Sequence, residues 1–560
     1  MIEAELSRLI REAAASAAAD LGIADLPAEI DVVRPKQKDH GDYATNLALA
    51  IAAETGTSPR EVAEILVRHL PDAEFVAKVE VAGPGFINFF LAHGWLYEVL
   101  GDVAQLGSGF GRVDIGGGER VQVEFVSANP TGPLHVGTGR NAVVGDSLAR
   151  VLEAAGYVVS REYYVNDAGS QADLFAASLE ARYQERFGRE ATIPQGGYEG
   201  SYVKTLAKEI ADELGESLLD AAESDRRVTL GREGMERALA GIRDTLKRFR
   251  VSFDSWFHES ELHAGGRIEQ AVEALRERDV AYEADGAVWF AASRFGDGKD
   301  RVLIRSTGDP TYFAADCAYL RDKFARGFDR LIYVWGADHH GTVARLRGAA
   351  QAYGYEADRV EVILTQLIAL YRGGEPVRMS KRTGEIVTLD ELLDEVGVDA
   401  ARYTLLTRST DTALDFDIEA AARQTLDNPV YYVQYAYARI ASILRYAEEQ
   451  GATLAPFDSV HAEELVHETE LDLLRTIAEF PEQITLAANL RAPYRLTRYV
   501  EEVAATFHRF YTECRVVTDD VSLTQARLHL AAATKQVIAN GLALLGVQAP
   551  ESMERLEEES

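Results

Sequence analysis

The pattern of apolar and polar positions predicts a small α/β domain over residues 1–110. Residues 78–82 alternate like a strand, and a glycine-proline turn leads into a second strand within 83–91. The glycine-dense stretch 107–118 follows and favours a linker. The first helix of this domain carries apolar residues at helical spacing on one face, namely Leu6, Ile10 and Ala14.

Beyond that linker, strand-like apolar runs alternate with helical periodicity. Residues 121–126 and 157–165 have the composition of buried strands, and 141–155 between them keeps its apolar residues in helical register. Such a β-α-β unit predicts a parallel sheet with right-handed crossovers. Later apolar runs at 331–335 and 360–363 predict further strands of the same kind.

The pattern therefore predicts a multidomain α/β protein. A Rossmann-like domain should occupy residues 116–395, interrupted near 172–265 by a mostly polar helical insertion. A connecting segment at 396–425 should lead to residues 426–560, where helical periodicity dominates and predicts an all-α domain.

Composition indicates a folded cytosolic protein. The chain has 560 residues, enough for three or four domains, and 47% of them are hydrophobic. No run approaches the roughly 18 consecutive apolar residues of a membrane helix, and the N-terminus lacks a secretory signal pattern. The two cysteines, Cys317 and Cys514, offer neither a disulfide framework nor a zinc knuckle.

The charge balance changes this picture. With 90 acidic against 58 basic residues, the formal net charge is −32, which repels polyanions. Taken alone, this charge favours an acidic metabolic enzyme over a nucleic-acid-binding protein. Any surface for RNA must gather its basic groups locally.

The segment from Ser127 to Thr138, SANPTGPLHVGT, carries the first candidate chemistry. Its prolines and Gly132 predict a tight turn between a strand and a helix, where free N–H groups and the helix dipole favour phosphate. His135 can donate a hydrogen bond to a phosphate oxygen, and Gly137 permits close backbone approach. The alternative is an ordinary β-α turn with a surface histidine.

A second basic segment, RMSKRTG, runs from Arg378 to Gly384. Glycines on both sides favour a mobile loop. Arg378 and Lys381 can supply positive charge as pyrophosphate leaves a triphosphate. The alternative is a solvated basic loop.

In this order the two segments resemble the HIGH and KMSKS signatures of class I aminoacyl-tRNA synthetases. The surrounding sequence resembles arginyl-tRNA synthetases over nearly the whole chain. The further matching segments are 40–46, 124–129, 163–171, 309–316, 336–341, 428–439, 507–514 and 545–553.

The resemblance implies a class I catalytic domain, an N-terminal domain that meets the tRNA elbow, and a C-terminal anticodon-binding domain. It implies an arginine-tRNA ligase that uses ATP with Mg²⁺ as a substrate complex and binds L-arginine and tRNA(Arg). We expect a cytoplasmic monomer with no structural metal and no DNA or membrane partner. Two alternatives stay open: another class I synthetase, and a catalytically silent tRNA-binding paralogue.

The resemblance also implies roles for individual residues. Catalytic roles fall on His135, Thr138, Arg378 and Lys381. ATP contacts fall on Gly132, His135, Gly137, Thr138, His339, Met379, Ser380 and Lys381. Arginine contacts fall on Glu124, Ser127, Asn129, Tyr312, Asp316 and Asp338. Contacts with tRNA fall on Asn46, Tyr435, Arg439, Tyr494, His508, Tyr511 and Met553.

The arginine-binding residues make chemical sense. A guanidinium group is a rigid fork of five donors without an acceptor, so its pocket should offer carboxylates and an aromatic face. Glu124, Asp316 and Tyr312 supply these groups. Taken singly, each has an ordinary alternative: a strand carboxylate facing water, a helix-start residue and a core aromatic.

Two other clusters each have a functional and an ordinary interpretation. Asp338-His-His340 does not predict zinc, because three adjacent residues cannot all point into one tetrahedral site. In the helical domain, tyrosines interleaved with arginines suit stacking on splayed bases and contact with phosphate. The alternative is that most of these tyrosines pack helices together.

Four positions depart from the family pattern. Thr138 replaces the second histidine of the first signature, Arg378 replaces the first lysine of the second, and Gly132 stands where some relatives carry a lysine. In the helical domain Tyr437 replaces a common histidine. Arg140 follows Thr138 closely and is a candidate to supply the missing positive charge.

Overall fold

The computed structural model describes residues 2–23, 27, 30–35, 37–377 and 387–553. The chain forms two compact units that share it in alternating stretches. The small unit contains residues 1–107, 446–478 and 509–533, and the large unit contains 108–445, 479–508 and 534–560. No helix formed by the described residues is both long and apolar enough to cross a membrane.

The small unit is built on a four-stranded antiparallel sheet in the order β1-β2-β4-β3. Its predicted first helix and its strands at 78–82 and 83–91 are confirmed, with Leu6, Ile10 and Ala14 buried against the sheet. The elements are α1 (Ile2–Ser16), α2 (Ala18–Leu21), β1 (Val32–Val33), β2 (Tyr43–Thr45), α3 (Leu47–Thr55), α4 (Pro59–Arg68), β3 (Val76–Ala82), β4 (Phe86–Leu91) and α5 (His93–Leu106).

Late parts of the chain complete this small unit. Helix α18 (Glu468–Ala478) packs against α5. Arg475 on α18 donates to the Asp42 carboxylate at 3.0 Å, and the Tyr97 hydroxyl donates to the Leu465 carbonyl oxygen at 3.1 Å. Residues more than 360 positions apart in sequence therefore stabilise one compact unit.

The centre of the large unit is a five-stranded, fully parallel sheet in the order β12-β11-β5-β6-β7. The strands are β5 (Arg120–Glu124), β6 (Val158–Val165), β7 (Ser255–His258), β11 (Arg330–Gly336) and β12 (Val360–Thr365). Chain order reverses between β5 and β11, so this is a doubly wound sheet with its switch point between those two strands. The predicted Rossmann-like arrangement is confirmed.

Two boundaries differ from the sequence prediction. Helix α6 (Val136–Ala154) begins at Val136 instead of Asn141, because the His135 ring accepts a hydrogen bond from the Thr138 amide and caps the first turn. Strand β7 lies inside the stretch predicted to be a helical insertion. It has only four residues and joins the sheet edge by pairing with β6, which no local pattern signals.

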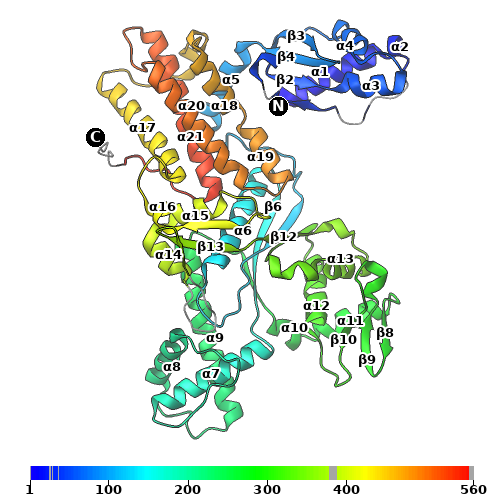
Figure 1. Ribbon diagram of the computed structural model, residues 1–560, viewed down its shortest axis with the longest axis vertical. Coiled ribbons are helices and arrows are strands. Elements are labelled where there is room, and N and C mark those ends of the chain that lie inside the picture. Colours follow the sequence, from blue (N-terminus) through cyan, green and yellow to red (C-terminus); the bar gives the residue numbers. More distant parts are fainter. Residues whose placement is uncertain (1, 24–26, 28–29, 36, 378–386, 554–560) are drawn as a thin grey trace. The chain divides into compact units, whose positions relative to one another are not determined.

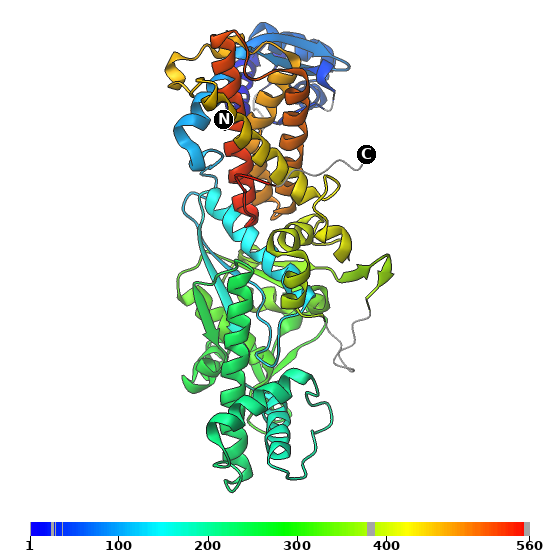
Figure 2. The ribbon, with the colours of Figure 1, turned by 90° about the vertical axis from the view of Figure 1, so that its left-hand side faces the viewer.

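Helices α7 (Ser170–Arg186), α8 (Ser201–Leu214) and α9 (Glu223–Arg248) form the expected insertion (Figure 1). They pack around their own apolar cluster, which includes Phe175, Leu179 and Val203. Figure 2 shows α9 as a long helix running from this group back toward the parallel sheet.

A second group of elements was not predicted. Its antiparallel sheet, β10-β9-β8, packs with helices between β7 and β12 in sequence (Figure 1). The elements are α10 (Ser260–Ala264), α11 (Arg267–Arg276), β8 (Ala281–Ala284), β9 (Ala287–Phe290), β10 (Arg301–Ile304), α12 (Tyr312–Ala325) and α13 (Val343–Ala352).

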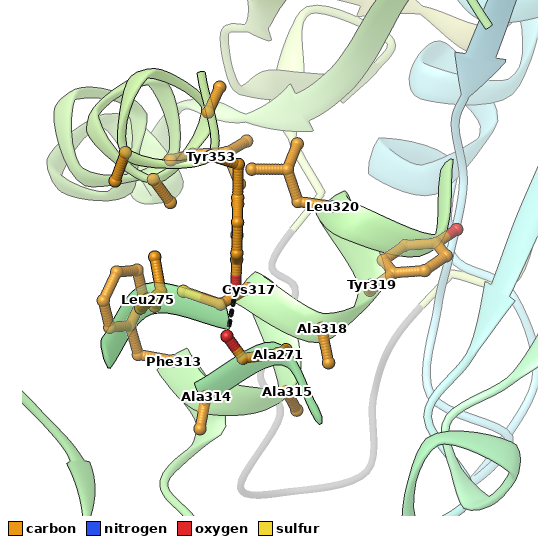
Figure 3. Close-up of a cluster of buried hydrophobic side chains, with 14 of the residues drawn as sticks. Ala271, Leu275, Phe313, Ala314, Ala315, Cys317, Ala318, Tyr319, Leu320 and Tyr353 are labelled. Atoms are coloured by element: carbon orange, nitrogen blue, oxygen red, sulfur yellow. Dashed lines mark hydrogen bonds between the residues drawn. The ribbon is translucent and has the colours of Figure 1, made fainter. Parts of the chain in front are cut away.

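Helix α12 has two different sides. Phe313, Cys317 and Leu320 are buried in the core shared with α11 and α13, where the Tyr353 hydroxyl donates to the Ala271 carbonyl oxygen at 3.0 Å (Figure 3). Tyr319 belongs to the same buried cluster, but Figure 3 shows that it leaves α12 on the side opposite Phe313. The second side of α12 is therefore available to the candidate site.

The remaining elements connect the parallel sheet to the helical part of the chain, where the predicted all-α organisation from residue 426 is confirmed. The connecting elements are β13 (Ile368–Arg372), β14 (Glu375–Pro376), α14 (Leu389–Val396), α15 (Val398–Leu406), β15 (Leu414–Asp417) and α16 (Ile418–Ala422). The helices that follow, besides α18, are α17 (Pro429–Glu449), α19 (Phe480–Asn489), α20 (Tyr494–Glu513) and α21 (Val521–Leu545).

Candidate active site

The first signature segment lies just beyond the carboxyl end of β5, beside the switch point of the parallel sheet. In doubly wound sheets ligands bind at this place. The His135 ring accepts from the Thr138 amide through Nδ1 at 3.3 Å, and its Nε2 lies 3.2 Å from the Thr138 hydroxyl. A neutral His135 that accepts at Nδ1 carries its proton on Nε2, so it donates to the threonine.

Glycine is required beside this histidine. A Cβ atom at Gly137 would lie 3.0 Å from Cε1 of His135, so a larger residue would displace the ring. At Gly132 a Cβ atom would lie 3.0 Å from the Tyr202 ring, which comes from the helical insertion. The close approach of this backbone to phosphate stays a prediction, because the neighbours in the structure are side chains of the protein.

The second signature segment, with Arg378, Met379, Ser380 and Lys381, lies outside the described residues. The chain after it returns directly to the first signature. Thr388 forms an antiparallel bridge with His135, and the Leu389 amide donates to the Leu134 carbonyl oxygen at 2.8 Å. Residues 388 and 389 therefore contact the first signature segment.

A strained turn connects β5 to the first signature. Val126 and Ser127 have φ angles of 68° and 40°, and the Ser127 amide donates to the Phe125 carbonyl oxygen at 3.0 Å. A β-branched residue rarely adopts such a conformation. It persists here because the Val126 amide donates to Asn141 Oδ1 at 2.6 Å, while Asn141 Nδ2 donates to the Val334 carbonyl oxygen at 2.7 Å.

This turn places Ser127 beside Glu124. The Ser127 hydroxyl accepts from the Tyr164 amide at 3.1 Å and donates to Glu124 Oε1 at 3.3 Å. Glu124 is only 5% exposed, and its other oxygen pairs with the buried Lys323 at 2.5 Å. The water-facing alternative for Glu124 is therefore wrong.

Asp316 lies in the middle of α12 and not at a helix start. Burial raises its pKa to about 7. Arg345 opposes this shift, whereas Glu259 and Glu124 add to it. These interactions place the three carboxylates near one another.

Glu259 is a site residue that the sequence analysis missed. It follows β7, is 4% exposed, and its pKa is raised by burial. The Tyr164 hydroxyl and His263 oppose that shift. Its place in the site depends on the pairing of β7 with β6, and a glutamate after a four-residue strand has no distinctive sequence pattern.

Tyr164 lies among these carboxylates. Burial raises its pKa, and Glu259, Asp316 and Glu124 raise it further. Three carboxylates from three separate elements thus surround one region at the carboxyl ends of the strands. Such a cluster favours a ligand with positive charge and several donors.

The other predicted arginine-binding residues are more exposed. Tyr312 is 53% exposed, so it is not a core aromatic, and its hydroxyl lies 2.8 Å from that of Ser170. Asn129 is also exposed. The Asp338 side chain is 83% exposed and pairs with His339 at 3.7 Å, so the structure does not place it with the buried carboxylates.

Arg140 does not supply charge to this site. Its guanidinium is buried and donates to the carbonyl oxygens of Gln366, Ser409 and Thr412, each at 2.9 Å. The candidate role from the sequence is therefore wrong for Arg140. Its position on α6 turns it toward the loops after β12 and before β15.

The predicted tRNA-binding residues fall into both units. In the large unit, Arg439 lies over the Tyr435 ring at 5.1 Å, His508 lies 6.2 Å from that ring, and Arg498 covers Tyr494 at 5.4 Å. Met553 lines a pocket with Tyr431 and Gln434. Two of the predicted residues lie exposed in the small unit. Asn46 precedes the first turn of α3, and Tyr511 lies on α20.

Tyr437, which replaces a common histidine, is buried. Its hydroxyl donates to Glu551 at 2.9 Å, and Lys535 lies 5.0 Å above its ring. These contacts give Tyr437 a packing role at the end of the chain.

No group of three or more histidine, cysteine, aspartate or glutamate side chains suited to a metal ion occurs within the described parts of the chain.

Three parts of the chain match models of known protein families. Residues 107–440 match the model for the tRNA synthetases class I (R) catalytic domain. Residues 4–91 match the arginyl tRNA synthetase N terminal domain, and 433–553 match the DALR anticodon binding domain. The chain belongs to the arginyl-tRNA synthetase family.

Relatives extend this family match along the whole chain. An arginine–tRNA ligase of Carboxydothermus hydrogenoformans is 49% identical over 99% of both chains. That of Moorella thermoacetica is 50% identical over 97% of both. The solved structure of Thermus thermophilus arginyl-tRNA synthetase has the same fold, with a TM-score of 0.76 and 24% identity over 99% of this chain and 100% of that one.

Proposed function

We propose that this enzyme activates L-arginine with ATP and transfers it to the terminal adenosine of tRNA(Arg), in the site formed by β5, α6, β7 and α12. The observation that supports this most directly is the cluster of Glu124, Glu259 and Asp316 beside the switch point. A guanidinium matches these carboxylates because it offers several donors in a fixed plane.

The first step is an in-line displacement. The carboxylate oxygen of arginine attacks the α-phosphorus of ATP, the bond to the β-phosphate oxygen breaks, and pyrophosphate leaves with its electron pair. We assign the stabilisation of the charge that develops on phosphate to His135, as the family resemblance implies, and to the N-terminal end of α6. Mg²⁺ enters with ATP and is held mainly by the phosphates.

We assign to Arg378 and Lys381 the stabilisation of negative charge on the leaving pyrophosphate, as the family resemblance implies. In the second step a ribose hydroxyl of the terminal adenosine attacks the arginyl carbonyl carbon, and AMP leaves. The cationic side chain of arginine stays with the three carboxylates through both steps.

We also propose the finer assignments that the family resemblance implies. These are a cytoplasmic monomer, tRNA contacts through the small unit and the helical domain, and domain limits at 1–110, 116–395, 396–425 and 426–560. Light scattering of the purified enzyme, alone and with tRNA, tests the monomer.

Amino-acid-dependent pyrophosphate exchange, run with each amino acid in the presence of tRNA, tests the proposed function. Arginine alone should support exchange, and lysine should be a poor substrate because an ammonium cannot satisfy the fork geometry. Exchange with a different amino acid indicates another class I synthetase. A folded protein that binds tRNA without exchange indicates a silent paralogue.

Variants of the carboxylates test the pocket itself. Asp316→Asn and Glu259→Gln should each raise the arginine KM at least tenfold while the ATP KM stays within about threefold. Asp322→Asn is the matched control, because Asp322 lies on the same helix but pairs with Arg267 and Arg326. Equal KM values for arginine in all three variants and the wild type contradict the pocket.

A further inference from the structure

Three side chains form a row across the central strands of the parallel sheet. Tyr333 on β11 pairs in register with Glu124 on β5, and Glu124 pairs with Glu162 on β6. Side chains in register on neighbouring parallel strands lie on the same face of a sheet. The row therefore brings two carboxylates side by side at almost complete burial, with Glu162 at 0% exposure.

Helix α12 covers this row with a face of its own. Asp316, Tyr319, Lys323 and Arg326 follow one another at spacings of three or four residues, so they share one side of the helix. The Tyr319 hydroxyl donates to Glu162 at 2.6 Å, and Arg326 donates to Glu162 at 2.5 and 2.9 Å. Glu162 thus has its own cation and hydroxyl donor.

Lys323 pairs with the other carboxylate of the row, Glu124. Its side chain is 0% exposed, and Nζ donates to Glu124 Oε2 at 2.5 Å. Nζ also lies 3.9 Å from the centre of the Tyr333 ring and 4.2 Å from that of Tyr319. The ammonium is therefore held between two aromatic faces and one carboxylate oxygen, which fixes its position.

This contact divides the two oxygens of Glu124. Oε2 faces the buried lysine, and Oε1 faces the Ser127 hydroxyl on the strained turn that begins the first signature. Two adjacent buried carboxylates repel each other unless each has a partner. The contact with Lys323 gives Glu124 such a partner and holds its carboxylate in one orientation.

We propose that Lys323 is a positioning residue for arginine binding: by pairing with Oε2 it fixes the orientation of the Glu124 carboxylate, with Oε1 directed toward the cationic substrate. This inference rests on the proposed function, in which Glu124 belongs to the arginine site. Lys323 has no contact with the substrate in this arrangement. It acts through one oxygen of Glu124 and leaves the other oxygen to the site.

The simpler alternative is a lysine that only neutralises the core. Removal of such a lysine lowers the stability of the fold and does not distinguish the affinity for arginine from that for ATP. Removal of a positioning lysine lowers the affinity for arginine and leaves the affinity for ATP unchanged. Steady-state kinetics of the full-length enzyme, measured with each substrate varied in turn, separates the two.

The principal variant is Lys323→Met, which keeps most of the length of the side chain and removes its charge. We expect an arginine KM at least tenfold higher, with the ATP KM and kcat at saturating arginine within about threefold of wild type. Lys323→Arg restores a cation and should recover most of the arginine affinity. The matched control is Arg326→Gln, one turn along α12, which removes the cation of Glu162 and should leave the arginine KM unchanged.

A folded Lys323→Met variant with an unchanged arginine KM overturns the proposal, as does equal loss of affinity for arginine and ATP. If this variant does not fold, Lys323→Met with Glu124→Gln keeps the test, since removing both partners of a buried pair is far less damaging than removing one. The double variant should match Glu124→Gln in arginine KM. A KM well above that of Glu124→Gln shows that Lys323 does not act through Glu124.

The proposed function and this inference fail in different ways. If Glu124→Gln and Asp316→Asn leave the arginine KM unchanged, the arginine pocket itself is wrong. If both raise it and Lys323→Met does not, only the positioning role is wrong.

Discussion

Single residues at this site owe their properties to their neighbours more than to their type. Asp316 is the clearest case: burial and two nearby carboxylates raise its pKa to about 7. A neutral carboxyl group cannot form an ion pair with a guanidinium, so in the proposed pocket the charge state of Asp316 should decide how well arginine binds.

The arginine KM should therefore depend on pH. Because the raised pKa keeps Asp316 protonated at low pH, the KM should rise by about tenfold for each pH unit below 7 and level off above about 8. Arginine KM values between pH 6 and 8.5 measure this, with the ATP KM as the control. A flat profile argues against Asp316 as a ligand.

The same shift affects stability with a definite sign. An acid whose pKa is raised in the folded state binds its proton more tightly there than in the unfolded chain. Its charged form therefore lowers stability progressively as pH rises from the unfolded value toward 7. Asp316→Asn should raise the unfolding midpoint at pH 8 while weakening arginine binding, and thermal unfolding at pH 5 and pH 8 checks this. An equal effect of the substitution at both pH values contradicts it.

Thr138 is expected to act through His135. Its hydroxyl lies 3.2 Å from Nε2 of the ring, so removing it loosens the histidine without removing the donor. His135→Ala should lower kcat by about two to three orders of magnitude, and Thr138→Ala by less than about tenfold. Aminoacylation kinetics measure both, and Thr138→Ser is the control that keeps the hydroxyl. A larger loss in Thr138→Ala than in His135→Ala reverses this order of importance.

Residue types alone could indicate the carboxylates at 124 and 316, because a guanidinium requires such groups. They could not indicate Glu259 or Lys323, because their roles depend on an edge strand and on the facing side of a helix. Arg140 shows the limit most clearly. Two residues from Thr138 it looked like a phosphate ligand, yet its rotation about α6 directs it to three backbone carbonyls.

At the scale of elements, strong periodicity was sufficient and short elements were not predictable. The long helices and the strands β5, β6, β11 and β12 follow patterns visible in the chain. Strands β7 to β10 have four residues each, and pairing with distant neighbours, more than local sequence, defines them. The helical domain was predictable because amphipathic periodicity persists over its whole length.

Helix ends meet at one buried arginine. Arg402 on α15 is 0% exposed and pairs with Asp146 on α6 at 2.5 Å. It also donates to the carbonyl oxygens of Leu545 and Phe249, at the ends of α21 and α9. Four helices therefore depend on one guanidinium, and a Cβ atom at Gly546 would clash with it.

Removing this guanidinium should destabilise the large unit strongly. Arg402→Met leaves Asp146 buried with one cation fewer. It should lower the free energy of unfolding by about 3–5 kcal/mol and so lower the thermal unfolding midpoint. Adding Asp146→Asn should recover part of the loss, because the unpaired charge disappears. Calorimetry of the three variants tests this, and additive losses in the double variant contradict it.

At the scale of the whole molecule, the net charge of −32 requires that contacts with RNA be local. The pairs Tyr435–Arg439 and Tyr494–Arg498 in the large unit each combine an aromatic ring with a cation. Stacking and phosphate contact together suit single-stranded RNA.

Charge removal at these pairs should weaken tRNA binding in a salt-dependent way. Arg439→Gln and Arg498→Gln should each raise the tRNA KM several-fold and reduce the slope of log KM against log salt by about one. Aminoacylation at 50 to 200 mM salt measures this, with Arg372→Gln as a control on an exposed pair with Glu395. An unchanged salt slope indicates that the arginines do not contact phosphate.

The shared construction of the small unit has a consequence for synthesis on the ribosome. Its first 107 residues contain an apolar cluster and can collapse early. Arg475 on α18, which binds Asp42, and Leu465, which binds Tyr97, are made more than 350 residues later. At about 5–20 residues per second, this leaves a wait of roughly 20 to 75 seconds. During that interval the docking side of the nascent domain is open to chaperones, and stalled chains of about 300 residues should be cleaved by protease near α5 more readily than the finished enzyme.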